Sequence, residues 1–312
     1  MYFYGEKFME YRVPGKNGAS VPVLGLGAWP IGGGMGHVDE QNAIALIHAA
    51  IDNGITLIDT AQAYRTSESI IGKALKNGYR DRCFLATKVS GGVTGGYSRQ
   101  AILTAIENSL RALQVDYVDL YQIHHWDEST PIEESMETMA ELQSQGKVRY
   151  IGVSNFNAEQ MQRALNTARF HSNQPAYNML ARHIEGEDIA FCEREGIGIL
   201  AHSVLAKGVL TGKYKPGHVF PPDDERSRFR HFQGEEFARD LAIADKLSNV
   251  AKDKGLTLVQ LAIAWVLRLP AVTCALVGAK TTQQVEEYVG AVGVTFTEEE
   301  LHRIDTILEG GD

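Results

Sequence analysis

The sequence predicts an α/β protein in which eight parallel strands, each followed by a helix, close into a (β/α)8 or TIM barrel. Two observations lead to this prediction. Short runs of β-forming residues alternate along the chain with longer stretches of helical periodicity. Most of the short runs are apolar on both faces, which is typical of a parallel sheet covered by helices. No repeat, linker or low-complexity tract divides the 312 residues, so we expect one domain spanning residues 1–312.

The strands are expected at residues 23–26, 56–59, 83–88, 118–124, 148–153, 170–174, 198–202 and 272–277. Helices are expected at residues 41–53, 98–113, 132–144, 158–168, 187–195, 258–267, 283–289 and 298–308. The same alternation also occurs in doubly wound sheets. However, the glycine clusters at residues 25–36 and 91–96 never form GxGxxG, and the chain has no GxxxxGK[ST] motif. The sequence therefore lacks the motifs that would support a doubly wound, dinucleotide-binding fold, and the barrel is favoured.

Two segments interrupt the regular alternation. Residues 11–13 and 20–23 flank the turn Pro14-Gly15-Lys16-Asn17-Gly18, and we expect them to form a β-hairpin before the first barrel strand. Residues 214–235 form a long polar loop after the seventh strand. Loops of this length in compact domains are usually functional covers or mobile segments.

The composition excludes several classes of protein. A net charge of −9 argues against a broad surface for nucleic acid or anionic membrane, while 44% hydrophobic residues allow a sizeable core. The longest apolar run, residues 261–267, is far shorter than the roughly 20 residues of a membrane span. The N-terminal stretch is interrupted by Glu6, Lys7 and Glu10 and does not resemble a signal peptide. We therefore expect a cytoplasmic protein without nucleic-acid or membrane partners.

The cysteines and histidines give no support to a metal site. The 3 cysteines lie far apart inside apolar runs, which is typical of buried free thiols in a reducing compartment. No Cys or His cluster has the spacing of a zinc site. His124 and His125 are adjacent, and neighbouring side chains on a strand point to opposite faces, so we do not expect them to share an ion. We expect no metal, with His124 inside the barrel and His125 at its rim or in packing.

Ionisable residues stand where three consecutive predicted strands end. Asp59, Lys88 and His124 close the second, third and fourth strands, and Tyr64 follows Asp59 by five residues. The carboxyl ends of barrel strands face the active-site mouth. Taken singly, these residues could be a structural ion pair, a packing tyrosine and a buried histidine. Their joint occurrence at three adjacent strand ends predicts a catalytic group.

Several segments, in order from about residue 20 to 305, resemble the aldo-keto reductase family. They are Ile58-Asp59-Thr60-Ala61-Gln62-Ala63-Tyr64, Ala86-Thr87-Lys88, Asp119-Leu120-Tyr121-Gln122-Ile123-His124, residues 146–156, Gln174-Pro175-Ala176-Tyr177-Asn178, residues 210–214 and residues 278–281. The resemblance implies a nicotinamide-dependent oxidoreductase. Such an enzyme would reversibly reduce an aldehyde, ketone or sugar-like carbonyl to the alcohol, so a small carbonyl compound is the expected partner.

The resemblance implies that Tyr64 donates the proton, with Lys88 and Asp59 as its partners, and that His124 orients the carbonyl oxygen. A phenol with a pKa of about 10 is a poor catalyst near neutrality. The adjacent ammonium is expected to bring the pKa of Tyr64 down. An aldolase or isomerase using Lys88 as a Schiff base is the alternative, but it needs an isolated lysine, and Asp59 argues against it.

For the cofactor, the resemblance implies that Ser154, Asn155 and Gln174 hold the nicotinamide carboxamide. The pyrophosphate path and the segment after the eighth strand supply the other expected contacts, which are Ser203, Leu205, Gly208, Gly278, Lys280, Thr281, Gln284 and Glu287. Barrels often bind phosphate after the eighth strand. The charge of Lys280 suits a 2′-phosphate, so we expect NADPH to be preferred over NADH. The alternative for Lys280 is a solvated surface lysine.

The chain also departs from the family. His202 stands where the family usually has a Tyr or Trp, and we expect it to stack on the nicotinamide and to titrate near physiological pH. Tyr288 replaces an Asn that often meets the adenine. Residues 65–68 are expected to be a short loop that opens one wall of the pocket. Substrate selectivity is expected to come from residues 29–35, His125-Trp126 and residues 220–232.

A second function remains open from the sequence. The potassium-channel β-subunits of this family resemble its enzymes yet act as partners of other proteins. The alternative to an enzyme is therefore a nicotinamide-binding regulatory subunit with weak or no turnover. The acidic composition favours the enzyme. The sequence does not predict the oligomeric state.

Overall fold

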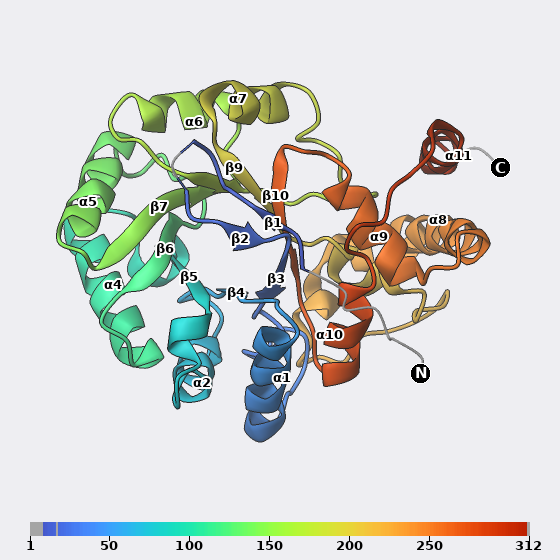
Figure 1. The fold of residues 1–312 in the computed structure, drawn as a ribbon, viewed down its shortest axis with the longest axis horizontal. Coiled ribbons are helices and arrows are strands. Elements are labelled where there is room, and N and C mark those ends of the chain that lie inside the picture. The colour runs from blue at the N-terminus through green and yellow to red at the C-terminus, as the bar shows by residue number, and fades with distance from the viewer. Residues whose placement is uncertain (1–8, 17, 311–312) are drawn as a thin grey trace, which may run out of the picture.

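The protein is described by a computed structural model of residues 9–16 and 18–310, and its centre is a closed barrel of eight parallel strands (Figure 1). The strands are β3 (Leu24–Gly27), β4 (Leu57–Asp59), β5 (Phe84–Val89), β6 (Val118–Ile123), β7 (Val148–Ser154), β8 (Ser172–Gln174), β9 (Gly198–Ala201) and β10 (Val272–Val277). They follow one another in chain order, and β10 closes the barrel by pairing with β3. The predicted fold class is confirmed.

Helices surround the barrel, as the apolar character of both strand faces requires. The helices are α1 (Glu40–Asp52), α2 (Ser67–Ala74), α3 (Gly91–Thr94), α4 (Arg99–Leu113), α5 (Ile132–Ser144), α6 (Ala158–Leu165), α7 (Glu187–Glu195), α8 (Gly234–Asp253), α9 (Leu258–Leu267), α10 (Thr282–Val289) and α11 (Glu298–Leu308). Every predicted helix is present, although α6 ends earlier than predicted. The sequence analysis missed α2, α3 and α8. Because α8 has charges along its length, its apolar stripe is hard to recognise.

Two apolar cores hold these layers together. The larger one fills the space between the strands and the helices. A smaller one lies inside the barrel, where the enclosed side chains are Val21, Leu57, Ala86, Leu120, Leu200, Cys274 and Leu276. This plug closes the barrel interior, so the open end is the one formed by the carboxyl ends of the strands. The cysteines Cys83, Cys192 and Cys274 are buried free thiols, as predicted.

The predicted N-terminal hairpin is present as β1 (Tyr11–Arg12) paired antiparallel with β2 (Val21–Pro22). Arg12 anchors it by donating to the carbonyl oxygens of Leu267 and Val272, at 3.2 and 2.6 Å. Residue 17 of the turn lies outside the described residues, as do residues 1–8, which include most of the N-terminal stretch considered above, and residues 311–312. No helix in the described part of the chain is both long and apolar enough to cross a bilayer.

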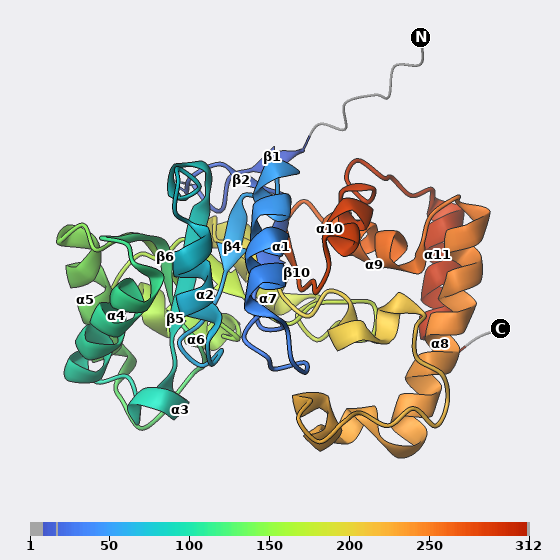
Figure 2. The ribbon, with the colours of Figure 1, turned by 90° about the horizontal axis from the view of Figure 1, so that it is seen from below.

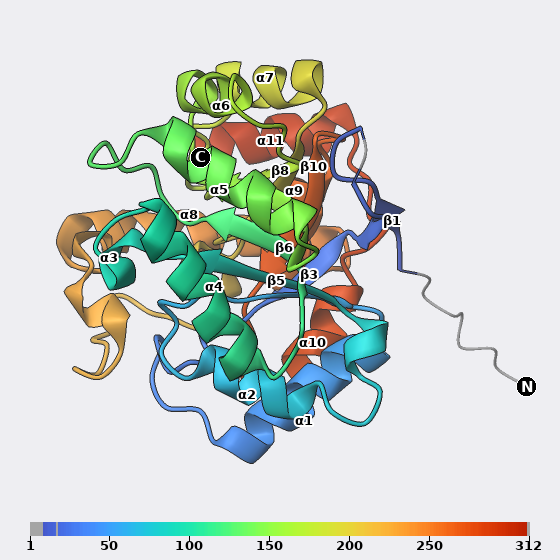
Figure 3. The same cartoon turned by 90° about the vertical axis from the view of Figure 1, so that its left-hand side faces the viewer.

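The long segment after β9 covers the end of the barrel opposite the hairpin (Figures 2 and 3). It begins with the short 3-10 helix η2 (Ala206–Thr211). The loop predicted at residues 214–235 is less irregular than expected, because it contains the short 3-10 helices η3 (Glu225–Arg228) and η4 (Arg230–Phe232). Phe220 and Phe232 stack edge to face at 5.2 Å and pack on Phe237 of α8. These aromatic side chains give the segment a small core of its own and hold its polar residues toward the barrel mouth.

Candidate functional site

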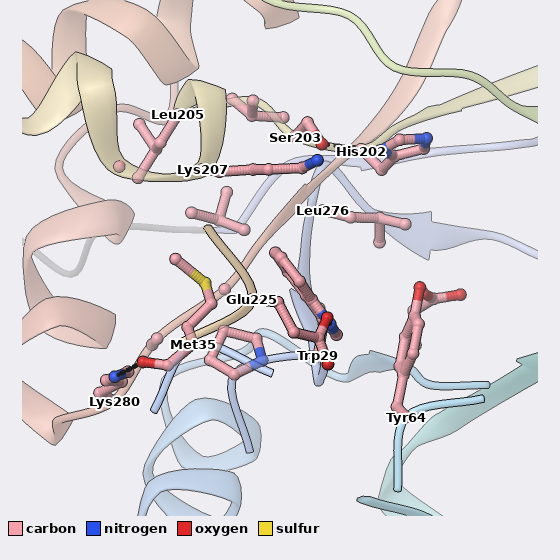
Figure 4. A pocket seen from close by; sticks show the side chains of 18 of the residues that line it. Trp29, Met35, Tyr64, His202, Ser203, Leu205, Lys207, Glu225, Leu276 and Lys280 are labelled. Carbon is pink, nitrogen blue, oxygen red and sulfur yellow. Dashed lines mark hydrogen bonds between the residues drawn. The ribbon is translucent and has the colours of Figure 1, made fainter. Parts of the chain in front are cut away.

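A cavity of about 430 Å³ opens at the carboxyl ends of the strands (Figure 4). Most of the predicted site residues line it, namely Asp59, Tyr64, His124, Ser154, Asn155, Gln174, His202, Ser203, Leu205, Gly208, Gly278, Lys280 and Gln284. Lys88 lies below this surface, beneath Asp59 and Tyr64. Thr281 and Glu287 do not line the cavity. In Figure 4, Tyr64 and Lys280 lie on opposite sides of the pocket, with Trp29 and Glu225 between them and Lys207 above these two in the view.

The floor of the cavity is a buried ion pair. Lys88 Nζ lies 2.6 Å from Asp59 Oδ1 and donates to Thr60 O at 2.8 Å, and the lysine is fully buried. The other carboxylate oxygen, Asp59 Oδ2, accepts from the amides of Gln122 and Gln174. Burial alone would favour a neutral amine, but Asp59 and Tyr64 together outweigh it and hold the pKa of Lys88 above its usual value. Lys88 is therefore a fixed ammonium ion, which does not suit a Schiff-base nucleophile.

Tyr64 lies directly above this ion pair. Lys88 Nζ is 5.1 Å from the centre of the Tyr64 ring, and the ring meets His124 edge-on at 5.7 Å. Burial raises the pKa of the Tyr64 phenol, and the opposing effect of Lys88 does not overcome it. The expectation that Lys88 brings the pKa of Tyr64 below its usual value is therefore wrong, because that expectation left out the desolvation of the phenolate. Tyr64 is protonated at neutral pH.

His124 is a neutral imidazole in the cavity wall. Burial, together with the charge of Lys88 and the neighbouring His125 and His202, lowers the pKa of His124 to about 2. Its Nδ1 atom is buried and has no hydrogen-bond partner among the described residues. A buried N–H without an acceptor costs more than an unused lone pair, so we place the proton on Nε2. That leaves Nε2–H as the donor that a carbonyl oxygen could use.

His125 is exposed and lines the cavity, which agrees with the expected place at the rim, but its ring does not point away from His124 as strand alternation predicted. Strand β6 ends at Ile123, so the alternation of side chains stops before the two histidines. The rings of His124 and His125 stack in parallel, with centres 4.6 Å apart and planes inclined by 8°, and both line the cavity. Trp126, in contrast, packs edge-on against Phe156 and lines no part of the cavity. It is a packing residue rather than the expected wall.

The ends of β7, β8 and β9 bring polar groups to the same wall. Ser154 Oγ donates to Gln174 O at 2.8 Å, and His202 Nε2 lies 3.0 Å from Asn155 Oδ1. His202 Nδ1 lies 2.9 Å from Ser203 Oγ. Burial, followed by the charges of Lys88 and Lys207, lowers the pKa of His202 to about 3. The expected titration of His202 near physiological pH is therefore wrong.

The two depressed histidines make stability depend on pH. With pKa values of about 2 and about 3 in the folded protein, His124 and His202 stay neutral where the unfolded chain, with a pKa of about 6.5, binds protons. The free energy of unfolding should therefore fall as the pH falls below about 6.5. Between pH 7.5 and 5.5 each imidazole should account for about 1.4 kcal/mol of the decrease. Urea unfolding at both pH values measures it.

A variant pair isolates this contribution. His202→Gln should make the pH dependence shallower by about 1.4 kcal/mol over the same interval. The exposed His302 on α11 provides the control, because His302→Gln removes a histidine that solvent already reaches. If His202→Gln and His302→Gln keep the same pH dependence as the unmodified protein, His202 is not held neutral by burial.

The far end of the cavity carries positive charge. Lys280 lines it, and its ammonium donates to the carbonyl oxygen of Met35. Burial and the nearby Arg226 lower the pKa of Lys280, and Asp224 opposes them. Thr281 and Gln284 instead form the capping box of α10, in which Gln284 Oε1 also accepts from Lys280 N at 2.7 Å. This capping box fixes the backbone that carries Lys280.

The expected loop at residues 65–68 is also different in the structure. Ser67 and Glu68 are buried and begin α2, and the exposed Arg65 pairs with Glu225 of the cavity wall at 2.9 Å. Tyr288 lines the cavity from α10, and its hydroxyl donates to Gly278 O at 2.8 Å. Whether the short loop opens this wall stays a prediction.

The sequence analysis missed several charged groups that the long segment brings to the cavity. Lys207 has a left-handed backbone with φ +51° and extends its ammonium over the ring of Phe229, at 4.1 Å from its centre. Within the described residues it forms no ion pair. Glu225 accepts from Trp29 Nε1 at 3.1 Å and pairs with Arg65 at 2.9 Å, which links three segments across the mouth. Lys207 lies between Leu205 and Gly208, two predicted cofactor contacts, and Glu225 lies in the predicted loop at residues 214–235, so their places in the sequence were the available signal.

Comparisons with known proteins place these features in a family context. The sequence profile of the Aldo/keto reductase family matches residues 23–309. The chain is 41% identical over 311 residues to aldo-keto reductase YhdN of Bacillus subtilis, which covers 96% of this chain and 94% of the relative. It is also 34% identical to a probable voltage-gated potassium channel subunit beta of Arabidopsis thaliana, with 96% and 97% covered.

Solved structures agree with these sequence relatives. A glycerol dehydrogenase from Gluconobacter oxydans superposes with a TM-score of 0.85 at 36% identity, covering 96% of this chain and 95% of that one. An aldo-keto reductase from Klebsiella pneumoniae in complex with NADPH gives a TM-score of 0.77 at 32% identity, with 96% and 95% covered. The similarity therefore extends over nearly the whole chain in both sequence and structure.

Proposed function

Because this chain belongs to the aldo-keto reductase family, which includes oxidoreductases that use nicotinamide cofactors, we propose that it reduces an aldehyde, ketone or sugar-like carbonyl with NADPH. In this proposal Tyr64 donates the proton to the substrate oxygen. The observation that carries it is the arrangement of Tyr64 above the buried Lys88–Asp59 pair, next to the neutral His124.

Each residue has a defined task in this mechanism. His124 donates its Nε2–H to the carbonyl oxygen and so orients the substrate beside Tyr64. Tyr64, protonated at neutral pH, gives its proton to that oxygen as negative charge develops. The ammonium of Lys88 stabilises the phenolate that remains, and Asp59 holds the ammonium in place. The nicotinamide supplies the hydride when it is bound.

The cavity has the donor set that such a cofactor needs. Ser154, Asn155 and Gln174 present hydroxyl and amide groups close to Tyr64, which suits a carboxamide. Further along, Lys207 lacks a carboxylate partner among the described residues, and such a cation suits a phosphate. Lys280 offers a second positive charge at the far end, which suits the 2′-phosphate of NADPH. These residues fit the cofactor, and the basic groups favour NADPH over NADH.

Lys280→Ala should weaken NADPH binding by about 10- to 100-fold and change NADH binding little. One charge-assisted contact contributes about 1.5–3 kcal/mol, and only NADPH carries the 2′-phosphate. Titration calorimetry with both cofactors measures the effect, and the exposed Lys252 on α8 provides the control variant Lys252→Ala. Equal losses for both cofactors would show that Lys280 does not select the 2′-phosphate.

The direct test of the function is turnover of simple aldehydes, followed by the absorbance of NADPH. The similarity to a channel β-subunit supports a second candidate function, which is that of a nicotinamide-binding regulatory subunit with weak or no turnover. The complete proton-transfer group favours the enzyme. Tight binding of NADPH without measurable turnover of any aldehyde, ketone or sugar would favour the regulatory subunit instead.

A further inference from the structure

Asn155 makes four side-chain hydrogen bonds in the cavity wall. It follows β7 in a left-handed conformation with φ +60°, which Asn adopts more readily than most residues. Its amide nitrogen Nδ2 lies 3.1 Å from His124 O, 3.2 Å from His125 Nδ1 and 3.0 Å from Ser154 Oγ. Its oxygen Oδ1 faces His202 Nε2 at 3.0 Å. Histidines therefore contact both ends of one amide.

These contacts allow one orientation of the amide. The carbonyl oxygen of His124 can only accept, so the NH2 end of Asn155 must face it. The Oδ1 end then faces His202, so His202 Nε2 carries its proton and donates to it. A neutral His202 has one ring proton, which leaves Nδ1 to accept from the hydroxyl of Ser203. The orientations of the amide and the imidazole therefore determine each other.

The number of donors and acceptors around Asn155 shows which of its hydrogen-bonding positions a ligand could still use. Three acceptors surround the two hydrogens of Nδ2. Oδ1 has two lone pairs and, among the residues that the structure describes, a single donor, His202. A ligand in the cavity would therefore meet Asn155 through the second lone pair of Oδ1, which accepts an N–H.

We propose that His202 is a positioning residue that fixes the amide of Asn155 so that Oδ1 accepts an N–H from the cofactor carboxamide. This inference rests on the proposed nicotinamide-dependent function. It differs from the stacking role expected from the sequence, in which His202 would act through the face of its ring. In the positioning role His202 acts through the edge of its ring, where both nitrogens are hydrogen-bonded to neighbouring side chains.

The positioning role and the stacking role of His202 predict different affinities for a cofactor analogue that lacks the carboxamide N–H. The probes are NADP⁺ and its analogue in which an acetyl group replaces the carboxamide, so that the carbonyl stays and the N–H is lost. His202→Phe keeps an aromatic face and removes the donor to Asn155, whereas His202→Gln removes the ring and keeps an N–H donor. The control is His302→Phe on the exposed face of α11. Dissociation constants are measured by calorimetry, with no turnover required.

We expect the unmodified protein and the control to bind NADP⁺ about 2- to 10-fold more tightly than the analogue, the size of one neutral hydrogen bond. In His202→Phe this ratio should fall to near one, and in His202→Gln it should be largely retained. Circular dichroism at the same temperature checks that each variant is folded. If His202→Phe does not fold, the ratio in His202→Gln still decides.

Three results would overturn the inference. His202→Phe could keep the ratio of the unmodified protein, or His202→Gln could lose affinity for both ligands equally, and either result would point to stacking. A ratio of one in the unmodified protein would mean that no carboxamide N–H is recognised. If the unmodified protein bound neither NADP⁺ nor NADPH, the proposed function itself would fail, and this inference with it.

Discussion

Tyr64→Phe is expected to lower the rate of carbonyl reduction by about 10²- to 10⁴-fold while changing the affinity for NADPH little, because general acid catalysis contributes on that order. The substitution removes one hydroxyl group and keeps the ring beside Lys88 and His124. The shape of the cavity and the contacts proposed for the cofactor are retained. Steady-state turnover of a simple aldehyde and calorimetric titration of NADPH measure the two quantities.

A matched tyrosine on the outside of the barrel provides the control. Tyr79 also loses one hydroxyl in Tyr79→Phe, but that hydroxyl donates to Asp52 on the surface. Turnover should then be unchanged. If Tyr64→Phe kept more than a few per cent of the original rate, the proton would come from another group, and the proposed role of Tyr64 would be wrong.

The residues at strand ends were predictable because the barrel itself brings them together. Asp59 and Lys88 close neighbouring strands, and parallel pairing of β4 with β5 places their carboxyl ends at one edge of the barrel. Once the strands are placed in the sequence, the meeting of Asp59, Lys88 and His124 follows from topology alone. The order of the strands and the hairpin were predictable for the same reason, since the alternating pattern repeats along the chain.

What the sequence could not predict depends on burial and on irregular backbone. The pKa of Tyr64 follows from a balance between desolvation and Lys88, and the sequence shows only the second. His125 lies beside His124 because β6 ends one residue earlier than the periodicity indicates. Lys207 lies in a segment whose sequence has neither helical nor strand periodicity. It reaches the cavity because its backbone is left-handed, a conformation that the sequence does not predict.

The buried ion pair also leads to the largest expected change in stability. Lys88→Met should lower the free energy of unfolding by about 3–5 kcal/mol, because removing one partner leaves a buried charge without compensation. Asp59 is 3% exposed, and it would keep only the amides of Gln122 and Gln174 and lose its ammonium partner. Urea unfolding of the variant measures the loss, and turnover should fall as well, because the proposed phenolate of Tyr64 would lose its cation.

A double variant separates the ion pair from simple packing. Asp59→Asn combined with Lys88→Met removes both charges and nearly preserves volume, and replacing a buried pair by neutral groups is often close to neutral for stability. We therefore expect the double variant to recover most of the stability lost in Lys88→Met. Turnover should stay low in both, because neither supplies an ammonium beneath Tyr64. If the double variant unfolded as easily as Lys88→Met, the loss of stability would come from the packing around the Lys88 side chain. The uncompensated carboxylate of Asp59 would then not be its cause.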